Sequence, residues 1–118
     1  MSNQPNKLIL VFGSLRKLSK RGYNFNRCGP QKYIRSLTLE GYDLFSLGSY
    51  PAICRGKGTL HCELHEVDNE TYESISNMEL GAAYSEGTVD LPEGPATIYL
   101  YPSDRLTNRQ KVESGDWN

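Results

Sequence analysis

Short segments with strand-like patterns, separated by glycine and proline, make up most of the sequence, and only one segment is convincingly helical. Leu8–Val11 is an apolar run too short for a helix, and Thr59–Val67 alternates with period two. The apolar residues of Glu70–Leu80 instead fall at helical spacing. Because strands and helices do not alternate regularly, the pattern predicts an α+β fold with a strongly curved or barrel-like sheet. We expect strands over Leu8–Val11, Tyr33–Leu39, Tyr42–Leu47, Ala52–Cys54, Thr59–Val67, Tyr84–Leu91 and Ala96–Tyr101.

Glycine, proline and aspartate mark the predicted ends of these elements. We place turns at Gly41 and at Gly48–Pro51, and a loop at Arg55–Gly58. Asp68 is the expected N-cap of the helix, and Gly81 is its expected C-cap.

The length and composition are typical of a small globular protein. A chain of 118 residues suffices for one domain, which we expect to span residues 1–118. No apolar run approaches the ~18 residues that a membrane helix needs, and the polar N-terminus does not resemble a secretory signal. The three cysteines show no CxxC spacing, which favours reduced thiols. We therefore expect a cytoplasmic protein without a membrane partner.

Two other functions receive little support from the sequence. His61, Glu63 and His65 share one face of a predicted strand, but the histidines would lie roughly 13 Å apart, too far to share one ion held at ~2 Å. The basic residues between positions 16 and 35 carry no recognised nucleic-acid-binding motif. We expect neither a bound metal nor a nucleic-acid partner.

The first predicted strand ends in a turn that suits the binding of a small anion. Gly13 and Ser14 allow a sharp bend, which leaves amide N–H groups without partners in the sheet. Such groups can face a carboxylate or a developing oxyanion. Seven of the 13 basic residues lie between positions 16 and 35, with no acid among them, and would draw an anion toward this turn. A solvated basic loop is the alternative interpretation.

Glu79 is the candidate catalytic residue. It ends the predicted helix, in which Ile75 and Met78 are expected to face the core. A carboxyl group drawn inward with them would have its pKa raised by desolvation, which suits acid/base catalysis near neutral pH. An ordinary surface glutamate is the alternative interpretation.

The order and spacing of these segments resemble the gamma-glutamylcyclotransferase-like family, which includes gamma-glutamylamine cyclotransferases and AIG2-like proteins. The matching motifs are Phe12-Gly13-Ser14-Leu15-Arg16, then Gly22 and Asn24, Gly41-Tyr42-Asp43-Leu44, Gly48-Ser49-Tyr50-Pro51-Ala52, Cys62-Glu63-Leu64-His65-Glu66-Val67-Asp68, Ile75-Ser76-Asn77-Met78-Glu79, Tyr84 and Gly115-Asp116-Trp117. The resemblance covers nearly the whole chain, from Leu8 to Trp117.

This resemblance implies a small mixed β-barrel of about six to seven strands, with one main helix, short flanking helices and a pocket at its mouth. It implies that Glu79 is the catalytic acid/base. The implied substrate-binding residues are Phe12, Gly13, Ser14, Leu15, Arg16 and Tyr84.

The implied reaction needs no metal and no organic cofactor. The α-amino group of a γ-glutamyl compound attacks its own γ-carbonyl group, and 5-oxoproline is released. The expected partner is therefore a small γ-glutamyl or other anionic molecule. We expect the protein to be a monomer or a homodimer.

Four residues depart from the family's pattern. This chain has Phe12 where the family usually has tyrosine, Ser76 in place of aspartate, Cys62 in place of a strand glycine and Glu86 in place of arginine. Because Glu86 exchanges a positive for a negative group near the proposed pocket, the substrate is left open. Two alternatives to an enzyme also stay open. One is a non-catalytic module that sequesters an anionic metabolite or nucleotide-like ligand, and the other is an interaction protein with a vestigial pocket.

Overall fold

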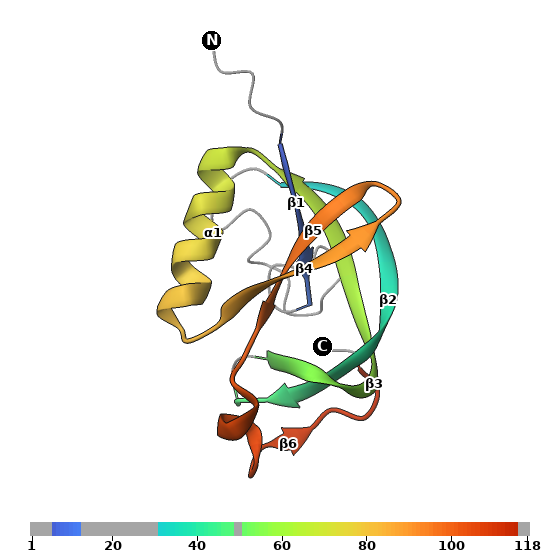
Figure 1. Cartoon of the computed structure of the whole chain (residues 1–118), viewed down its shortest axis with the longest axis vertical. Coiled ribbons are helices and arrows are strands. Elements are labelled where there is room, and N and C mark those ends of the chain that lie inside the picture. The colour runs from blue at the N-terminus through green and yellow to red at the C-terminus, as the bar shows by residue number, and fades with distance from the viewer. Residues whose placement is uncertain (1–5, 13–30, 49–50, 116–118) are drawn as a thin grey trace.

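This computed structural model describes residues 6–12, 31–48 and 51–115. They form a single curled sheet with a helix against it (Figure 1). These residues form six strands, β1 (Lys7–Val11), β2 (Gln31–Ser46), β3 (Pro51–Val67), β4 (Ser85–Leu91), β5 (Gly94–Leu100) and β6 (Gln110–Lys111). Two helices accompany them, α1 (Asn69–Gly81) and the 3-10 helix η2 (Ser103–Leu106). The predicted α+β fold with a strongly curved sheet is confirmed.

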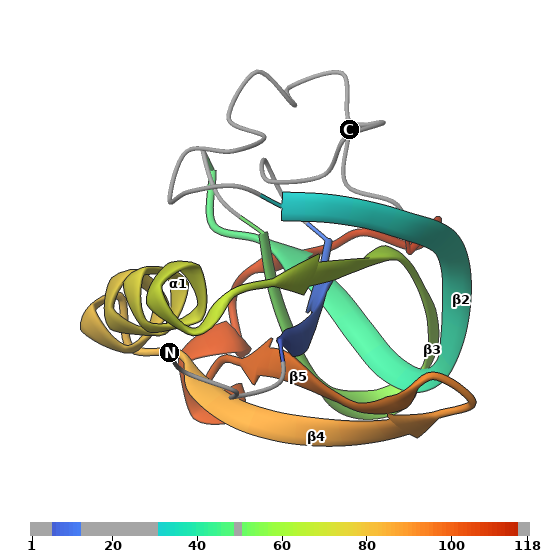
Figure 2. The same cartoon turned by 90° about the horizontal axis from the view of Figure 1, so that it is seen from above.

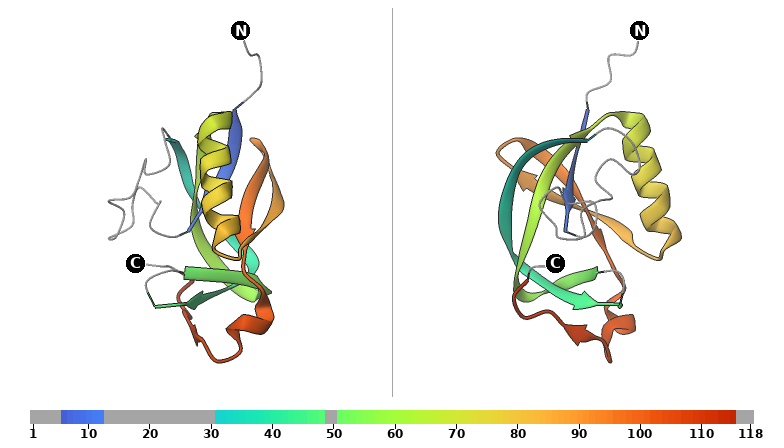
Figure 3. Two further views of the ribbon diagram at one scale, coloured as in Figure 1. Left: turned by 90° about the vertical axis from the view of Figure 1, so that its left-hand side faces the viewer. Right: turned by 180° about the vertical axis from the view of Figure 1, so that it is seen from behind.

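The strand order in the sheet is β4-β5-β1-β3-β2-β6. β1 lies near the centre, antiparallel to β3 and parallel to β5. Figure 2 shows the sheet curling around an interior, with α1 outside the curl. Figure 3 shows η2 and β6 together at one end of the sheet.

The two faces of the sheet bury different sets of apolar side chains. On β1, Leu10 belongs to a cluster with Leu64 and Ile98 that fills the inside of the curl. Ile9 points the other way, into a second cluster with Ile75 of α1. This alternation follows from the two-residue period of a strand, and it places α1 on the outer face.

The two longest strands differ from the prediction. We expected separate short strands around a turn at Gly41 and a loop at Arg55–Gly58, but β2 and β3 run through both segments without interruption. Gly41 has a φ of +95° and sits at a register shift, so it forms a bulge rather than a turn. Gly58 donates its N–H to Asp43 Oδ1 (2.9 Å), which replaces part of the local ladder.

The helix begins where the sequence predicts. Asp68 is the N-cap, and its carboxylate accepts a hydrogen bond from the Thr71 N–H at 2.7 Å. This bond lowers the pKa of Asp68. Ile75 is buried, as expected, and Met78 packs against the same cluster. Neither described helix is long and apolar enough to cross a membrane.

Candidate active site

Glu79 lies in the last turn of α1, three and four residues after the buried Ser76 and Ile75. Its side chain is half-buried. Desolvation by burial raises its pKa from 4.5 to about 7. The expected rise in pKa is therefore confirmed. At this pKa, Glu79 exists in both protonation states near neutral pH, as an acid/base group requires.

The chain after Glu79 fixes the position of this last turn. The backbone oxygen of Glu79 accepts hydrogen bonds from the N–H groups of Ala82 and Tyr84, each at 3.0 Å. The Leu80 oxygen accepts from Ala83, at 3.2 Å, which completes a Schellman motif. The predicted C-cap at Gly81 is wrong, since Gly81 is still helical and Ala82 is the C-cap.

The residue in the left-handed conformation of this motif is Ala83, with φ of +78°. Glycine adopts this conformation without the penalty of a Cβ atom. Ala83→Gly is therefore expected to raise the free energy of unfolding by ~1 kcal/mol. Urea denaturation monitored by circular dichroism would measure it. A loss of stability would show that the Cβ atom of Ala83 contributes more packing than it costs in strain.

A hydrogen-bonded cluster of four side chains includes Ser76, which precedes Glu79 by three residues on α1. Glu86 of β4 accepts from the hydroxyls of Tyr72 (2.8 Å) and Ser76 (3.0 Å), both on α1. The Ser76 hydroxyl also bonds to the Tyr99 hydroxyl of β5, at 2.6 Å. Tyr72, Ser76 and Glu79 lie on one side of the helix because they are separated by four and three residues.

Sequence reasoning singled out Ser76 and Glu86 only as departures from a family pattern, and the structure shows that these two residues contact each other. Tyr99 is buried, and its hydroxyl is part of the cluster. Glu86 and Tyr99 are direct cross-strand partners in the β4–β5 pair. A correct prediction of the pairing register of β4 and β5 would have placed Glu86 and Tyr99 opposite each other.

The predicted substrate-binding residues are only partly described. Phe12 is buried in the cluster inside the curl. Gly13, Ser14, Leu15 and Arg16 lie outside the described residues, so their approach to Glu79 stays a prediction.

Tyr84 is buried directly after the turn that follows Glu79. Its hydroxyl donates to the backbone oxygen of Pro51, and its ring meets that of Tyr101 edge to face at 5.1 Å. These contacts tie the start of β4 to the start of β3. A role of Tyr84 in substrate binding stays a prediction.

Glu63 and His65, considered above as metal ligands, are both fully buried and contact each other. His65 Nε2 lies 2.9 Å from Glu63 Oε1, and His65 Nδ1 lies 2.7 Å from Gln31 Oε1. The backbone N–H of His61 donates to Gly115 of the tail at 2.7 Å. No group of three or more metal-binding side chains is found among the described residues.

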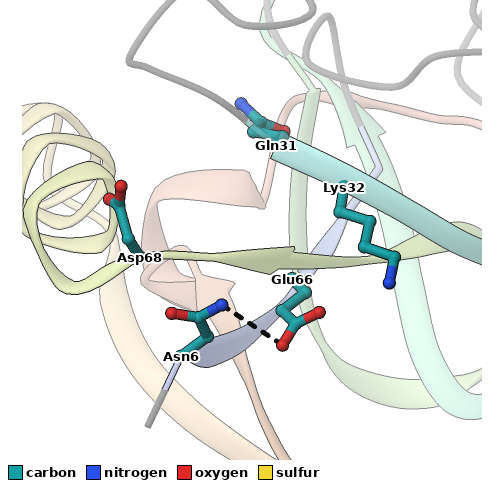
Figure 4. A pocket seen from close by; sticks show the side chains of 5 residues that line it. All are labelled: Asn6, Gln31, Lys32, Glu66 and Asp68. Atoms are coloured by element: carbon teal, nitrogen blue, oxygen red, sulfur yellow. Dashed lines mark hydrogen bonds between the residues drawn. The ribbon is translucent and has the colours of Figure 1, made fainter. Parts of the chain in front are cut away.

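A pocket of about 270 Å³ lies at the opposite end of α1 from Glu79, and Figure 4 shows its lining. It is lined by Asn6, Gln31, Lys32, Glu66 and Asp68. Asp68 precedes Glu79 by eleven residues, which corresponds to ~16 Å along a helix. The pocket also brings carboxylates and a lysine together without a dominant charge. It is therefore distinct from the candidate acid/base site.

Of the basic residues between positions 16 and 35, Lys32 and Arg35 are described. Arg35 forms a two-pronged ion pair with Glu93, with Nε–Oε2 and Nη2–Oε1 distances of 2.6 and 3.1 Å. The Arg35 guanidinium group is therefore paired at the surface with the turn that precedes β5, and it is not directed at Glu79.

Comparison with known proteins gives one consistent family. Residues 9–118 match the sequence pattern of the family described as "Gamma-glutamyl cyclotransferase, AIG2-like". The "Gamma-glutamylcyclotransferase family protein YtfP" of Escherichia coli (strain K12) is 35% identical over 112 residues, which cover 92% of this chain and 94% of that protein.

Solved structures agree with this result. The crystal structure of protein PH0828 from Pyrococcus horikoshii superposes with a TM-score of 0.74 at 29% identity, covering 93% of this chain and 88% of that one. The solution structure of Escherichia coli ytfP gives a TM-score of 0.71 at 32% identity, covering 93% and 95%. An aig2-like protein of Mus musculus, at 17% identity and a TM-score of 0.71, covers 98% and 90% and shares the fold.

Proposed function

The chain belongs to the gamma-glutamylcyclotransferase, AIG2-like family, and from this premise we propose that it releases 5-oxoproline from a small γ-glutamyl amine or peptide. Family membership supports an enzyme of the gamma-glutamylcyclotransferase type. The observation that carries the proposal is the half-buried Glu79, whose pKa is raised to about 7 at the position that matches the family's acid/base.

In the proposed reaction, the neutral α-amino nitrogen of the substrate attacks the γ-carbonyl carbon of the same glutamyl unit and forms a five-membered ring. Glu79 takes one proton from this nitrogen as the new C–N bond forms. Glu79 returns the proton to the departing nitrogen as its bond to the carbonyl carbon breaks. The products are 5-oxoproline and a free amine or peptide, so atoms and charges balance without a further reactant.

The proposal also assigns the substrate's negative charge to the turn after β1. The N–H groups from Phe12 to Leu15 would hold the α-carboxylate or stabilise the oxygen of the attacked carbonyl group. Only Phe12 of this segment lies within the described residues. Phe12 directly follows Val11, the last residue of β1, which packs in the same cluster as Ile75 of α1.

A product assay over a panel of γ-glutamyl amines and dipeptides tests this function. We expect 5-oxoproline and the free amine to appear in equal amounts for at least one compound. The same compound with an acetylated α-amino group is the matched control, because it lacks the nucleophile and must stay intact. Binding of panel members without any product would contradict the proposal and favour a sequestering module.

The activity is expected to depend on the ionisation of Glu79. In the free enzyme the base must be deprotonated, so kcat/KM should rise with pH and reach half its maximum at about pH 7. A carboxyl group with an ordinary pKa would place this midpoint near 4.5. Initial rates between pH 3.5 and 9 at low substrate concentration would measure it, and a midpoint near 4.5 would contradict a base with the raised pKa of Glu79.

A further inference from the structure

We propose that Glu86 selects substrates whose leaving group carries a positive charge, such as the γ-glutamyl amide of a diamine. The inference deepens the function proposed above and rests on it, because it names the class of amine that Glu79 would help to release. Its basis is a fixed, exposed carboxylate that contacts α1 one turn before Glu79.

Two hydroxyl groups of α1 hold the Glu86 carboxylate in one place. Tyr72 donates to Oε1 at 2.8 Å, and Ser76 donates to Oε2 at 3.0 Å. Both donors are neutral, so they fix the position of the carboxylate without neutralising its charge. Each carboxylate oxygen can accept a second hydrogen bond, and Glu86 is exposed. A cationic group of a ligand can therefore approach it from solvent.

The Glu86 charge is not paired with a cation of the described residues. Lys7 is the cation beside Tyr72, but its Nζ lies over the Tyr72 ring, 5.8 Å from the ring centre. The ion pairs within residues 6–12, 31–48 and 51–115 join other groups, namely Arg35 to Glu93, Lys111 to Asp43 and His65 to Glu63. Because an exposed glutamate is charged at neutral pH, Glu86 presents a negative charge to a ligand that binds beside it.

Glu86 lies within reach of a substrate held at Glu79. Ser76 and Glu79 are three residues apart on α1, which places their Cβ atoms about 5–6 Å apart. Through its 3.0 Å bond to Ser76 Oγ, Glu86 Oε2 therefore lies at most about 10 Å from the Glu79 Cβ atom. The leaving nitrogen must lie within hydrogen-bond distance of Glu79, which returns the proton to it. A leaving group of six single bonds spans about 7 Å when extended, as two residues of extended backbone do.

The charges of the substrate determine which of its parts faces Glu86. The α-carboxylate would be repelled by the Glu86 carboxylate. The α-amino group must be neutral to attack, whereas a carboxylate beside it would favour the ammonium form. The leaving group is the remaining part, and it begins at the nitrogen next to Glu79. A positive charge at its far end would be attracted by Glu86, and a negative charge would be repelled.

A matched series of three γ-glutamyl amides tests the inference. The amides of diaminopentane, hexylamine and aminocaproate have leaving groups of equal length that end in an ammonium, a methyl and a carboxylate group. We expect kcat/KM to fall in this order, by about fivefold at each step, as an exposed charge pair allows. The difference should appear in KM rather than in kcat, because the charge is remote from the reacting bonds.

Glu86→Gln should bring the three kcat/KM values to within about twofold of one another, because the amide has a similar size and no charge. Glu73→Gln is the matched control, since it removes an exposed carboxylate from α1 and should keep the order of the three compounds. A measurement on the wild-type protein does not depend on the folding of a variant: sodium chloride at about 0.5 M should weaken the preference, because salt screens exposed charges.

Equal kcat/KM values for the three compounds in the wild-type protein would overturn the inference and leave the proposed function intact, since 5-oxoproline would still form. A preference that persists in Glu86→Gln would overturn it as well. Calorimetric binding of the three intact compounds to Glu79→Gln should show the same order of affinity. Equal affinities there would overturn the selection by Glu86 even if no compound were turned over, which separates this test from the test of the proposed function.

Discussion

Replacing Glu79 by glutamine is expected to lower kcat for 5-oxoproline release by about 10³-fold, since the amide can neither accept the amine proton nor return it to the leaving group. Binding of the intact substrate, measured by calorimetry on the inactive variant, should change little. Glu73→Gln removes a carboxylate from an exposed face of the same helix and should keep activity within about twofold. Equal activities of the Glu79 and Glu73 variants would remove Glu79 from the mechanism.

The same substitution should have an opposite effect on stability. The folded-state pKa of Glu79 is raised from 4.5 to about 7. Its contribution to stability is fully present below about pH 4.5, and it is lost as the pH rises through about 7. The difference between the two values corresponds to at most ~3 kcal/mol. Glu79→Gln should therefore match wild type at pH 4 and exceed its stability at pH 8, which urea unfolding at both pH values would measure.

Replacing Gly115 by alanine is expected to lower the free energy of unfolding by about 3 kcal/mol. Gly115 has a φ of +71°, and a Cβ atom there would lie 1.8 Å from the backbone oxygen of Thr59. The tail and β3 cannot both keep their positions around such an atom. The hydrogen bond from the His61 N–H to the Gly115 oxygen, 2.7 Å long, would be lost as they separate.

Urea denaturation would measure the free energy of unfolding of Gly115→Ala, and Gly81→Ala is the matched control. Gly81 lies in the last turn of α1, without a positive φ and with no atom within 4 Å of a built Cβ. Gly81→Ala should therefore raise stability by ~0.5–1 kcal/mol through helix propensity. A Gly115→Ala variant as stable as wild type would show that the tail does not hold the edge of β3.

Local sequence patterns correctly predicted those elements that are determined by residues close together in the sequence. The apolar run of β1 and the aspartate cap of α1 are such signals, and both predictions are confirmed. The burial of Glu79 was also predictable, because Ile75 and Met78 mark the buried side of its helix. The acid/base candidate could thus be located before the fold was known.

Glycine caused the errors in element boundaries. Gly41 and the Arg55–Gly58 segment carry turn-like residues, but pairing between β2 and β3 absorbs them as irregularities within long strands. At the end of α1, the left-handed position is taken by Ala83 although Gly81 is only two residues away. In β2 and β3, strand pairing outweighed the local preference for a turn or loop.

The cluster around Glu86 could not be predicted from local patterns. Ser76 and Tyr99 are separated by 23 residues and meet only because α1 packs beside the β4–β5 pair. From the sequence, Ser76 and Glu86 were two separate departures from a family pattern. Their hydrogen bond shows that the two departures are physically linked.

The role of Glu79 as acid/base is tested most directly by a carbon-13 NMR titration of its carboxyl group in the ligand-free wild-type protein, with kcat/KM measured on the same sample across the same pH range. Both should titrate with a midpoint of about 7. A carboxyl group that titrates near 4.5, or a rate that rises without following it, would contradict the assignment of Glu79 as the proton carrier.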